Sequence, residues 1–370
     1  MKKGLFKVFG LIFCLILFFP YFGYGFSYLD GQLTVNGYVQ NQTSLRTTNW
    51  DWVSSEYQVQ LEIGYNLSDA VSFYGIWRSL YESMYDIGNW KDKYDDSHES
   101  LAWENEFREI YADINVGDLS LRLGKQQIVW GETDGMRLMD IINPLDERRQ
   151  FIARSWEDIR IPLYAVKAMY QINMERNVFL ETVWVPANIE KNDMYSNVDE
   201  WGLTTPGRDK SPWTAFAHPP ELLGKMISIP LVKVTMWDDQ KANTVKNSEY
   251  GARICGEIGG WFLTLNYFHS FNDDPTIIMG TPYRDRFKMV IPLRYKYFKQ
   301  RTYGFTFNKA RGLWVFRGEF AYYPDLPYQV WSPTNLKYQL NHPKLVALSL
   351  IHISEPTRPL YISYAVFCLK

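Results

Sequence analysis

The 370-residue chain is poor in the side chains that most often build disulfide frameworks and metal centres. It contains only 3 cysteines and 5 histidines. Cys14 lies in an apolar N-terminal stretch and Cys368 lies near the end of the chain, which leaves Cys255 without an evident partner. A small secreted domain held together by disulfides is therefore not expected. No H-E-x-x-H or similar ligand spacing occurs, so we expect no metal site.

Motifs of the common enzyme families are also missing. The chain has no G-x-S-x-G sequence, and Gly124-Lys125 is followed by Gln126 where a phosphate-binding loop needs Ser or Thr. We expect no catalytic residues and no cofactor, and the protein is not expected to be an enzyme. A hydrolase whose triad is assembled across strands remains a third hypothesis, because triads are recognised by geometry.

The chain has no excess of charge of either sign. The formal net charge is −2, so there is no electrostatic reason to expect nucleic acid as a partner. Aromatic residues are abundant instead, at 17% of the chain with 26 Tyr and 14 Trp. Such residues suit a membrane-water boundary, where one side of the ring is dry and the other is wet.

Long apolar runs are absent after residue 26, and none approaches the ~18 residues of a spanning helix. The first residues form a basic segment, an apolar run over 8–19 and a small-residue pattern at Gly23-Tyr24-Gly25. This order predicts a signal peptide over residues 1–25, cleaved after Gly25. An uncleaved membrane anchor is the alternative, although the run is short for it. The mature chain is thus expected to be secreted or to form a barrel.

Alternating apolar and polar residues predict antiparallel strands through most of the chain. From Tyr57 to Tyr65 the two kinds alternate, and Asn66–Asp69 follows as a turn. The clearest hairpin has Gly117-Asp118 between two alternating runs. Further short turns are expected at residues 173–177, 259–260 and 309–312. Longer polar segments lie between them, at 47–56, 86–103, 126–158, 187–246 and 270–290.

This regular exchange of short and long connections is typical of an outer-membrane barrel. We expect an all-β fold, an antiparallel transmembrane β-barrel with short periplasmic turns and long extracellular loops. About 11–12 strands can be read, the first at residues 33–46. Bacterial barrels use an even number of strands, so an incomplete part of a larger barrel is expected over residues 26–347. A soluble β-sandwich is the alternative.

The last residues have a different character. Residues 348–370 resemble the in-frame translation of a DNA-sequencing library adapter and its primer, with Pro359-Leu360-Tyr361 between the two pieces. They are expected not to belong to the natural chain, to contact the barrel little and to add no strand in register.

The most distinctive stretch runs from Arg122 to Asp146. A strand ending Gly124-Lys-Gln-Gln127 leads into Trp130-Gly-Glu132 and then Asn143-Pro-Leu-Asp146. This order resembles the signature of a family of large, functionally uncharacterised proteobacterial outer-membrane barrels. The resemblance is strong over residues 105–165 and looser over 30–340. It implies a porin-like fold and an outer-membrane location, and it implies little about substrate.

The same stretch crowds opposite charges into one loop. Two interpretations of this loop stay open. In one, the loop folds into the pore and forms a constriction, since clustered charges select ions and polar solutes. The alternative is a solvated rim loop with a helical turn over residues 136–142. The predicted constriction residues are Glu132, Asp134, Arg137, Asp140, Asp146, Arg148 and Arg149.

Strand alternation also predicts which charged residues face the lumen. They are Glu62, Glu109, Asp113, Arg122, Glu249, Arg253, Glu257, Arg317 and Glu319. Together they indicate a wetted interior or one whose charges pair within the wall. Trp77 and Trp130 are assigned to an aromatic girdle in preference to a sugar-stacking surface.

The leading functional hypothesis is an outer-membrane channel of a Gram-negative cell for passive or selective passage of small solutes, hydrophobic or weakly charged compounds among them. A barrel used for structure or surface interaction, with residues 187–246 as its binding loop, is the rival. An outer-membrane hydrolase is the third. Expected partners are outer-membrane lipid, lipopolysaccharide, the barrel-assembly machinery and periplasmic chaperones.

Overall fold

A computed structural model of the chain describes fourteen segments. They are residues 21–46, 51–86, 102–133, 138–146, 155–186, 232–239, 245–272, 276–279, 283–285, 288–312, 314–325, 328–332, 335–339 and 344–353. The chain is all-β in these segments apart from single helical turns. None of the helices among the described residues is long and apolar enough to cross a membrane.

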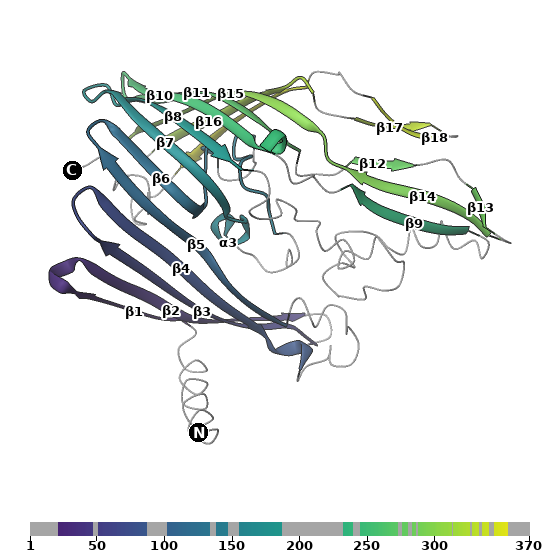
Figure 1. Cartoon of the computed structure of the whole chain (residues 1–370), viewed down its shortest axis with the longest axis horizontal. Coiled ribbons are helices and arrows are strands. Elements are labelled where there is room, and N and C mark those ends of the chain that lie inside the picture. The colour runs from purple at the N-terminus through teal and green to yellow at the C-terminus, as the bar shows by residue number, and fades with distance from the viewer. Residues whose placement is uncertain are drawn as a thin grey trace.

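One antiparallel sheet of 13 strands dominates the structure (Figure 1). In spatial order its strands are β1 (Tyr21–Tyr28), β2 (Leu33–Arg46), β3 (Asp51–Asn66), β4 (Val71–Glu82), β5 (Trp103–Val116), β6 (Leu119–Gln126), β7 (Leu163–Asn173), β8 (Val178–Val185), β10 (Glu249–Ile258), β11 (Trp261–Phe271), β15 (Lys299–Arg311), β16 (Trp314–Tyr323) and β19 (Lys344–Ile353). Strands that follow one another in the chain are mostly neighbours in this sheet, as in a barrel wall.

The remaining elements are short. A second sheet holds β12 (Thr276–Met279), β14 (Lys288–Lys296) and β13 (Tyr283–Asp285), with β9 (Val232–Asp239) paired to β14 in parallel. A separate hairpin holds β17 (Tyr328–Ser332) and β18 (Asn335–Gln339). The helical turns are η1 (Leu29–Gly31), η2 (Ser83–Tyr85), α3 (Trp156–Ile159) and η4 (Val245–Asn247). Strands β9, β12 and β13 fall inside segments that the sequence pattern treats as long connections. Strands β14, β17 and β18 and the parallel pair were not predicted.

The five predicted short turns are confirmed. They join β3 to β4, β5 to β6, β7 to β8, β10 to β11 and β15 to β16. Gly117 adopts φ +58° and Gly259 φ +59°, backbone angles that residues with a side chain rarely adopt, so glycine suits these tight links. The predicted long segment at 47–56 is shorter than expected, because residues 51–56 belong to β3.

Both edges of the sheet differ from the sequence prediction. The first expected strand began at residue 33, but β1 precedes it and pairs with β2 from Tyr21↔Gln40 to Tyr28↔Leu33. Cleavage after Gly25 would remove residues 21–25 of this strand. The signal peptide itself stays a prediction.

At the other edge, residues 348–353 were expected to add no strand, and this expectation is wrong. They form the second half of β19, which pairs with β16 along its whole length. The edge of β16 offers a row of unpaired backbone donors and acceptors, and such an edge accepts an extended segment whatever its side chains. The origin of residues 348–370 stays a prediction.

The two faces of the main sheet are inverted relative to a water-soluble protein. On the inner face, polar side chains such as Glu319 and Thr306 are buried. On the outer face, large apolar side chains are exposed, including Leu61, Ile63, Phe73, Phe107, Ile110, Ile254 and Leu265. Because side chains alternate along a strand, the same period-2 pattern that forms each strand also sorts its residues between the faces.

Candidate functional site

The described parts of the connection between β6 and β7 lie against the inner face of the sheet. Figure 1 shows α3, which belongs to this segment, on the concave side of the curved wall. We call residues 127–133, 138–146 and 155–162 the insertion; the structure describes these parts of it. Its contacts reach both the β4–β5 part of the wall and the β8–β16 part.

The underside of the insertion has an apolar core of its own. Ile128, Trp130 and Ile142 are at most 2% exposed and pack with Val183 of β8 and Phe268 of β11. Trp130 meets Phe268 edge-on at 5.8 Å between ring centroids. Removing apolar surface from water is favourable by about 25 cal/mol per Å², so this burial stabilises the position of the insertion. The insertion is therefore packed onto the wall like a protein core.

Glycines on the wall make room for this packing. A Cβ atom at Gly304 of β15 would overlap the side chain of Met139. One at Gly251 of β10 would lie 2.9 Å from Cη2 of Trp130. Strand glycines often mark such close approaches, so these two positions follow from the shape of the insertion.

A single carboxylate on β16 fixes the middle of the insertion. Glu319 accepts hydrogen bonds from four backbone N–H groups: those of Glu132 and Thr133 (2.8 Å for the latter) on one oxygen, and Leu138 (3.1 Å) and Met139 (3.0 Å) on the other. Backbone donors in a loop have no strand partner, so the carboxylate replaces the missing ladder. Glu319 is 2% exposed.

Two neighbouring side chains add to this clamp. The Tyr323 hydroxyl donates to the Leu138 carbonyl at 2.5 Å, and Asn308 Nδ2 donates to Glu132 Oε2 at 2.7 Å. Burial raises the pKa of the Glu132 carboxyl, while the bond from Asn308 lowers it. The predicted constriction residue Glu132 is thus tied to β15 and β16.

A charged pair on β8 and β10 meets the same part of the insertion. Glu181 accepts from Trp130 Nε1 at 2.7 Å and from an Arg253 guanidinium nitrogen at 3.2 Å. The guanidinium also lies 5.5 Å from the centre of a Trp130 ring. Trp130 therefore does not belong to an aromatic girdle, as the sequence suggested, because it is 0% exposed and faces inward.

The last part of the insertion is held by Asp140 and Asn143. Arg160 Nε donates to Asp140 Oδ2 at 2.8 Å, and both side chains are buried. Asn143 accepts from the Ile128 N–H at 2.7 Å and donates to the carbonyls of Gln126 and Ile161. The Asn143 amide thus connects the segment that enters the insertion to the segment that leaves it. This gives the Asn-Pro-Leu-Asp motif a structural role.

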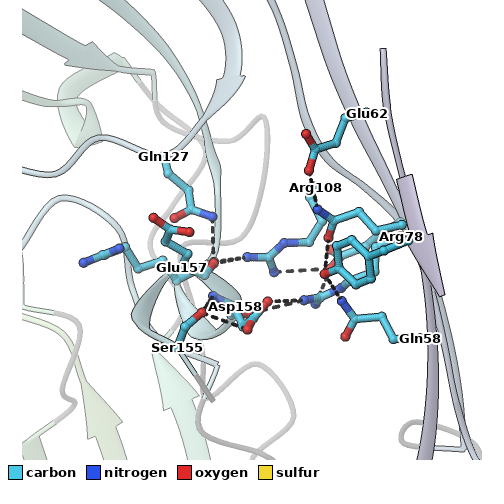
Figure 2. Close-up of polar contacts among 12 residues, drawn as sticks. Gln58, Glu62, Arg78, Arg108, Gln127, Ser155, Glu157 and Asp158 are labelled. Carbon is cyan, nitrogen blue, oxygen red and sulfur yellow. Dashed lines mark hydrogen bonds and ion pairs between the residues drawn. The ribbon is translucent and has the colours of Figure 1, made fainter. Parts of the chain in front are cut away.

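On the opposite side, α3 is bound to β4 and β5 (Figure 2). Arg108 donates to the carbonyls of Glu157 and Arg160, each at 2.8 Å. Arg78 donates to Glu106 at 2.9 Å and lies 3.8 Å from the Asp158 carboxylate. Figure 2 shows both guanidinium groups extending from the wall towards Glu157 and Asp158.

A β-bulge aims Arg108 at α3. Ile76 pairs with Glu109 and Trp77 pairs with Phe107, so Arg108 is the extra residue of the pair. Phe107 is exposed on the outer face while Arg108 is buried on the inner one. Bulges commonly re-aim a side chain in this way, and this one shifts the alternation on which the sequence prediction relied.

Beside α3, polar side chains form a hydrogen-bonded ladder on the inner face of β2–β4. Gln58 donates to the Tyr38 hydroxyl at 2.6 Å, and this hydroxyl donates in turn to Gln60 Oε1 at 3.2 Å. Gln60 donates in turn to Glu62 at 2.8 Å, and the Tyr74 hydroxyl donates to Glu62 at 3.3 Å. The inner face of β2–β4 is therefore polar.

The predicted constriction residues fall into two groups. Asp134, Arg137, Arg148 and Arg149 lie outside the described residues. Glu132 and Asp140 lie in the insertion as described above, and Asp146 donates its backbone N–H to the Ile159 carbonyl at 2.6 Å. No helical turn forms over the described residues 138–142, where the alternative reading placed one.

The predicted lumen residues are mostly on the inner face with partners. Arg122 and Asp113 form a bidentate pair at 2.7 and 2.9 Å. Glu109 and Arg317 are half-buried, Glu249 accepts from the Phe271 N–H at 3.1 Å, and Glu257 is exposed at the turn end of β10.

Comparison with known proteins gives a family. A family model described as "Protein of unknown function (DUF1302)" matches residues 29–358. The chain belongs to this family. No curated protein matches the sequence. A solved structure described as Salmonella typhi OmpF in complex with daunomycin aligns at 9% identity with a TM-score of 0.35. The alignment covers 82% of this chain and 66% of that one, slightly less than two thirds of its length.

Sequence reasoning missed several residues that organise the insertion of this DUF1302 chain. They are Arg78, Arg108, Asn143, Arg160 and Glu181. Lys167, which lies on the inner face of β7 beside Arg122, was missed as well. Lys167 and Glu181 share a face with buried apolar neighbours, so alternation alone could have placed them inside. Arg108 could not be placed, because nothing local announces the bulge.

Proposed function

We propose that this protein is an outer-membrane β-barrel that lets small solutes pass beside an inward-folded insertion. The observation that carries the proposal is the inverted wall. A water-soluble protein rarely exposes large contiguous apolar patches, whereas a transmembrane strand alternates an apolar lipid-facing side with a polar lumen side. Leu61, Phe107 and Leu265 are 40%, 59% and 61% exposed on the outer face.

Aromatic rows on the outer face support a membrane position. Tyr267, Tyr303 and Tyr322 are register partners on β11, β15 and β16, with ring centroids 5.2 and 6.3 Å apart. Tyr81 stacks between Tyr57 and Trp103 on β3–β5, at 6.4 and 4.3 Å. Rows of this kind mark the level of lipid headgroups.

The spacing between aromatic levels also fits a bilayer. Tyr57, near the middle of β3, and Tyr65, near its end, face outward, and the strand between them spans about 26 Å at ~3.3 Å per residue. A strand tilt of about 40° reduces this to about 20 Å, near the ~25 Å apolar band of outer-membrane barrels. Outer-membrane lipid, lipopolysaccharide, the assembly machinery and periplasmic chaperones are therefore its proposed partners.

The polar inner wall supports passage of solutes. Hydrogen-bonding side chains on β2–β4 and charged ones on β5–β10 would keep the space beside the insertion hydrated. The proposed cargo is small. Passage of hydrophobic compounds, which the sequence left open, gains no support from the polar wall described here.

A structural barrel without transport is the second candidate. It is favoured by one observation, namely that the insertion is bound to both sides of the wall, through Arg108 on β5 and Glu319 on β16. A lumen closed by the insertion would conduct nothing.

Conductance separates these two functions. We expect the purified, folded chain to form pores in planar bilayers with ohmic steps of the small size typical of a partly filled lumen. A refolded sample whose heat-shifted gel mobility is intact serves as the folding control. Folded protein that inserts and gives no steps would favour the structural barrel.

Labelling from outside the cell tests the orientation. Gly117→Cys lies in the β5–β6 turn and is expected to resist a membrane-impermeant thiol reagent on whole cells, because short turns face the periplasm. Val245→Cys is placed at the other end of the wall, where Val245 is 83% exposed, and it is expected to react. In broken cells both variants should react with the reagent. Reaction of Gly117→Cys alone on whole cells would reverse the proposed topology.

A further inference from the structure

A belt of five charged side chains crosses the inner face of the wall, with a step of two residues between β7 and β8. Asp113 on β5, Arg122 on β6 and Lys167 on β7 are register partners in turn. Glu181 on β8 and Arg253 on β10 are register partners one strand further on. We call these five residues the charge belt. It contains three cations and two anions.

Four of the five charges are paired within the belt. Arg122 donates to both oxygens of Asp113, at 2.7 and 2.9 Å. Arg253 binds Glu181, which is 5% exposed, and the same carboxylate also accepts from Trp130. Buried pairs of this geometry cancel most of each other's field at a distance.

Lys167 is the remaining charge. Among the described residues it forms no ion pair, although Glu181, Arg122, Arg253 and Asp113 are the charged groups close enough to influence it. Lys167 is half-buried on the inner face of β7, beside Arg122 of β6. The belt therefore presents one uncompensated positive charge.

Lys167 lies beside the insertion, where the passage is narrowed. Ala165, two residues earlier on the same face of β7, is packed under the apolar core of the insertion. Lys167 is the next inward residue towards the short-turn end, so it stands at the lower margin of the insertion. The other nearby carboxylate, Glu109, faces Arg108 and Arg122 and accepts a backbone hydrogen bond from Gln127. Arg108, which is not part of the belt, and this backbone donor thus both stabilise the Glu109 carboxylate.

We propose that Lys167 sets the charge preference of the passage and makes it a path for small anions, such as carboxylates or inorganic anions. This rests on the proposed function, since a charge can select ions only where ions pass. One fixed charge at a narrow place raises the local concentration of counter-ions and lowers that of co-ions. At about 7 Å in water the effect amounts to roughly a three-fold change for each ion, before screening by salt.

Reversal potentials in a KCl gradient test this. The full chain is expected to favour Cl⁻ over K⁺, and Lys167→Gln is expected to lower that permeability ratio by roughly three-fold or more. Lys167→Glu should reverse the preference, whereas Lys167→Arg should keep it. Lys309→Gln is the matched control, because Lys309 binds the Gly259 carbonyl at a turn and lies outside the lumen. It should leave the ratio unchanged.

The two proposals fail in different ways. A conducting chain whose ratio is the same in Lys167→Gln as in the original would overturn the role of Lys167 and leave the channel intact. Folded, inserted protein without any conductance would overturn both. If Lys167→Gln does not fold, Lys167→Arg and Lys167→Glu must still differ in the sign of their reversal potentials, and equal values would overturn the inference.

Discussion

Glu319→Ala is expected to release the insertion from β16 and to enlarge the pore. The substitution leaves the four backbone N–H groups of residues 132, 133, 138 and 139 without their shared acceptor. An unsatisfied buried donor costs about 1–3 kcal/mol, and water entering the released loop offsets part of that. We expect a loss of roughly 3 kcal/mol in the free energy of unfolding, measured by urea titration in lipid vesicles.

The functional consequence is measured on the same protein. Conductance in planar bilayers should rise several-fold, since the insertion fills part of the lumen, and protease added from outside should cut within the insertion. Glu175→Ala removes the same side chain from an exposed position in the β7–β8 turn and is expected to change neither. A Glu319→Ala protein with unchanged stability and conductance would mean that the apolar core alone holds the insertion.

The wall was predictable because its signals are local. Turns such as Gly117-Asp118 and Gly259-Gly260 need a positive φ that the sequence announces, and the alternation between them assigns each side chain to a face. All eleven strands read from the sequence occur between β2 and β16. The two edge strands were missed, because residues 21–25 of β1 were assigned to a signal peptide and residues 348–353 of β19 to a foreign tail.

The insertion was not predictable in the same way, because its contacts are distant in the sequence. Glu132 and Glu319 are 187 residues apart, and Trp130 and Glu181 are 51 apart. The charge pattern drew attention to residues 132–146, but it gave no partner for any of them. Asp140 was grouped with other acids facing a pore, whereas the structure pairs it with Arg160, which the sequence did not single out.

This pairing changes what neutralising Asp140 should do. Asp140→Asn leaves the Arg160 guanidinium, which is 9% exposed, buried without its carboxylate. Breaking a buried pair from one side costs about 3–5 kcal/mol, because the remaining charge stays desolvated. We therefore expect the free energy of unfolding to fall by roughly 3 kcal/mol.

A double-mutant cycle makes this test specific. Asp140→Asn and Arg160→Gln are each expected to destabilise the fold, and the double variant should be more stable than the sum of the two losses predicts, by about 1–3 kcal/mol of coupling. Asp118→Asn, an exposed turn residue, is the matched control and should have almost no effect. Additive losses would show that Asp140 and Arg160 act separately. Asp140 would then return to the group of acids that face passing ions, and a shift of the reversal potential towards anions in Asp140→Asn would follow from its lost negative charge.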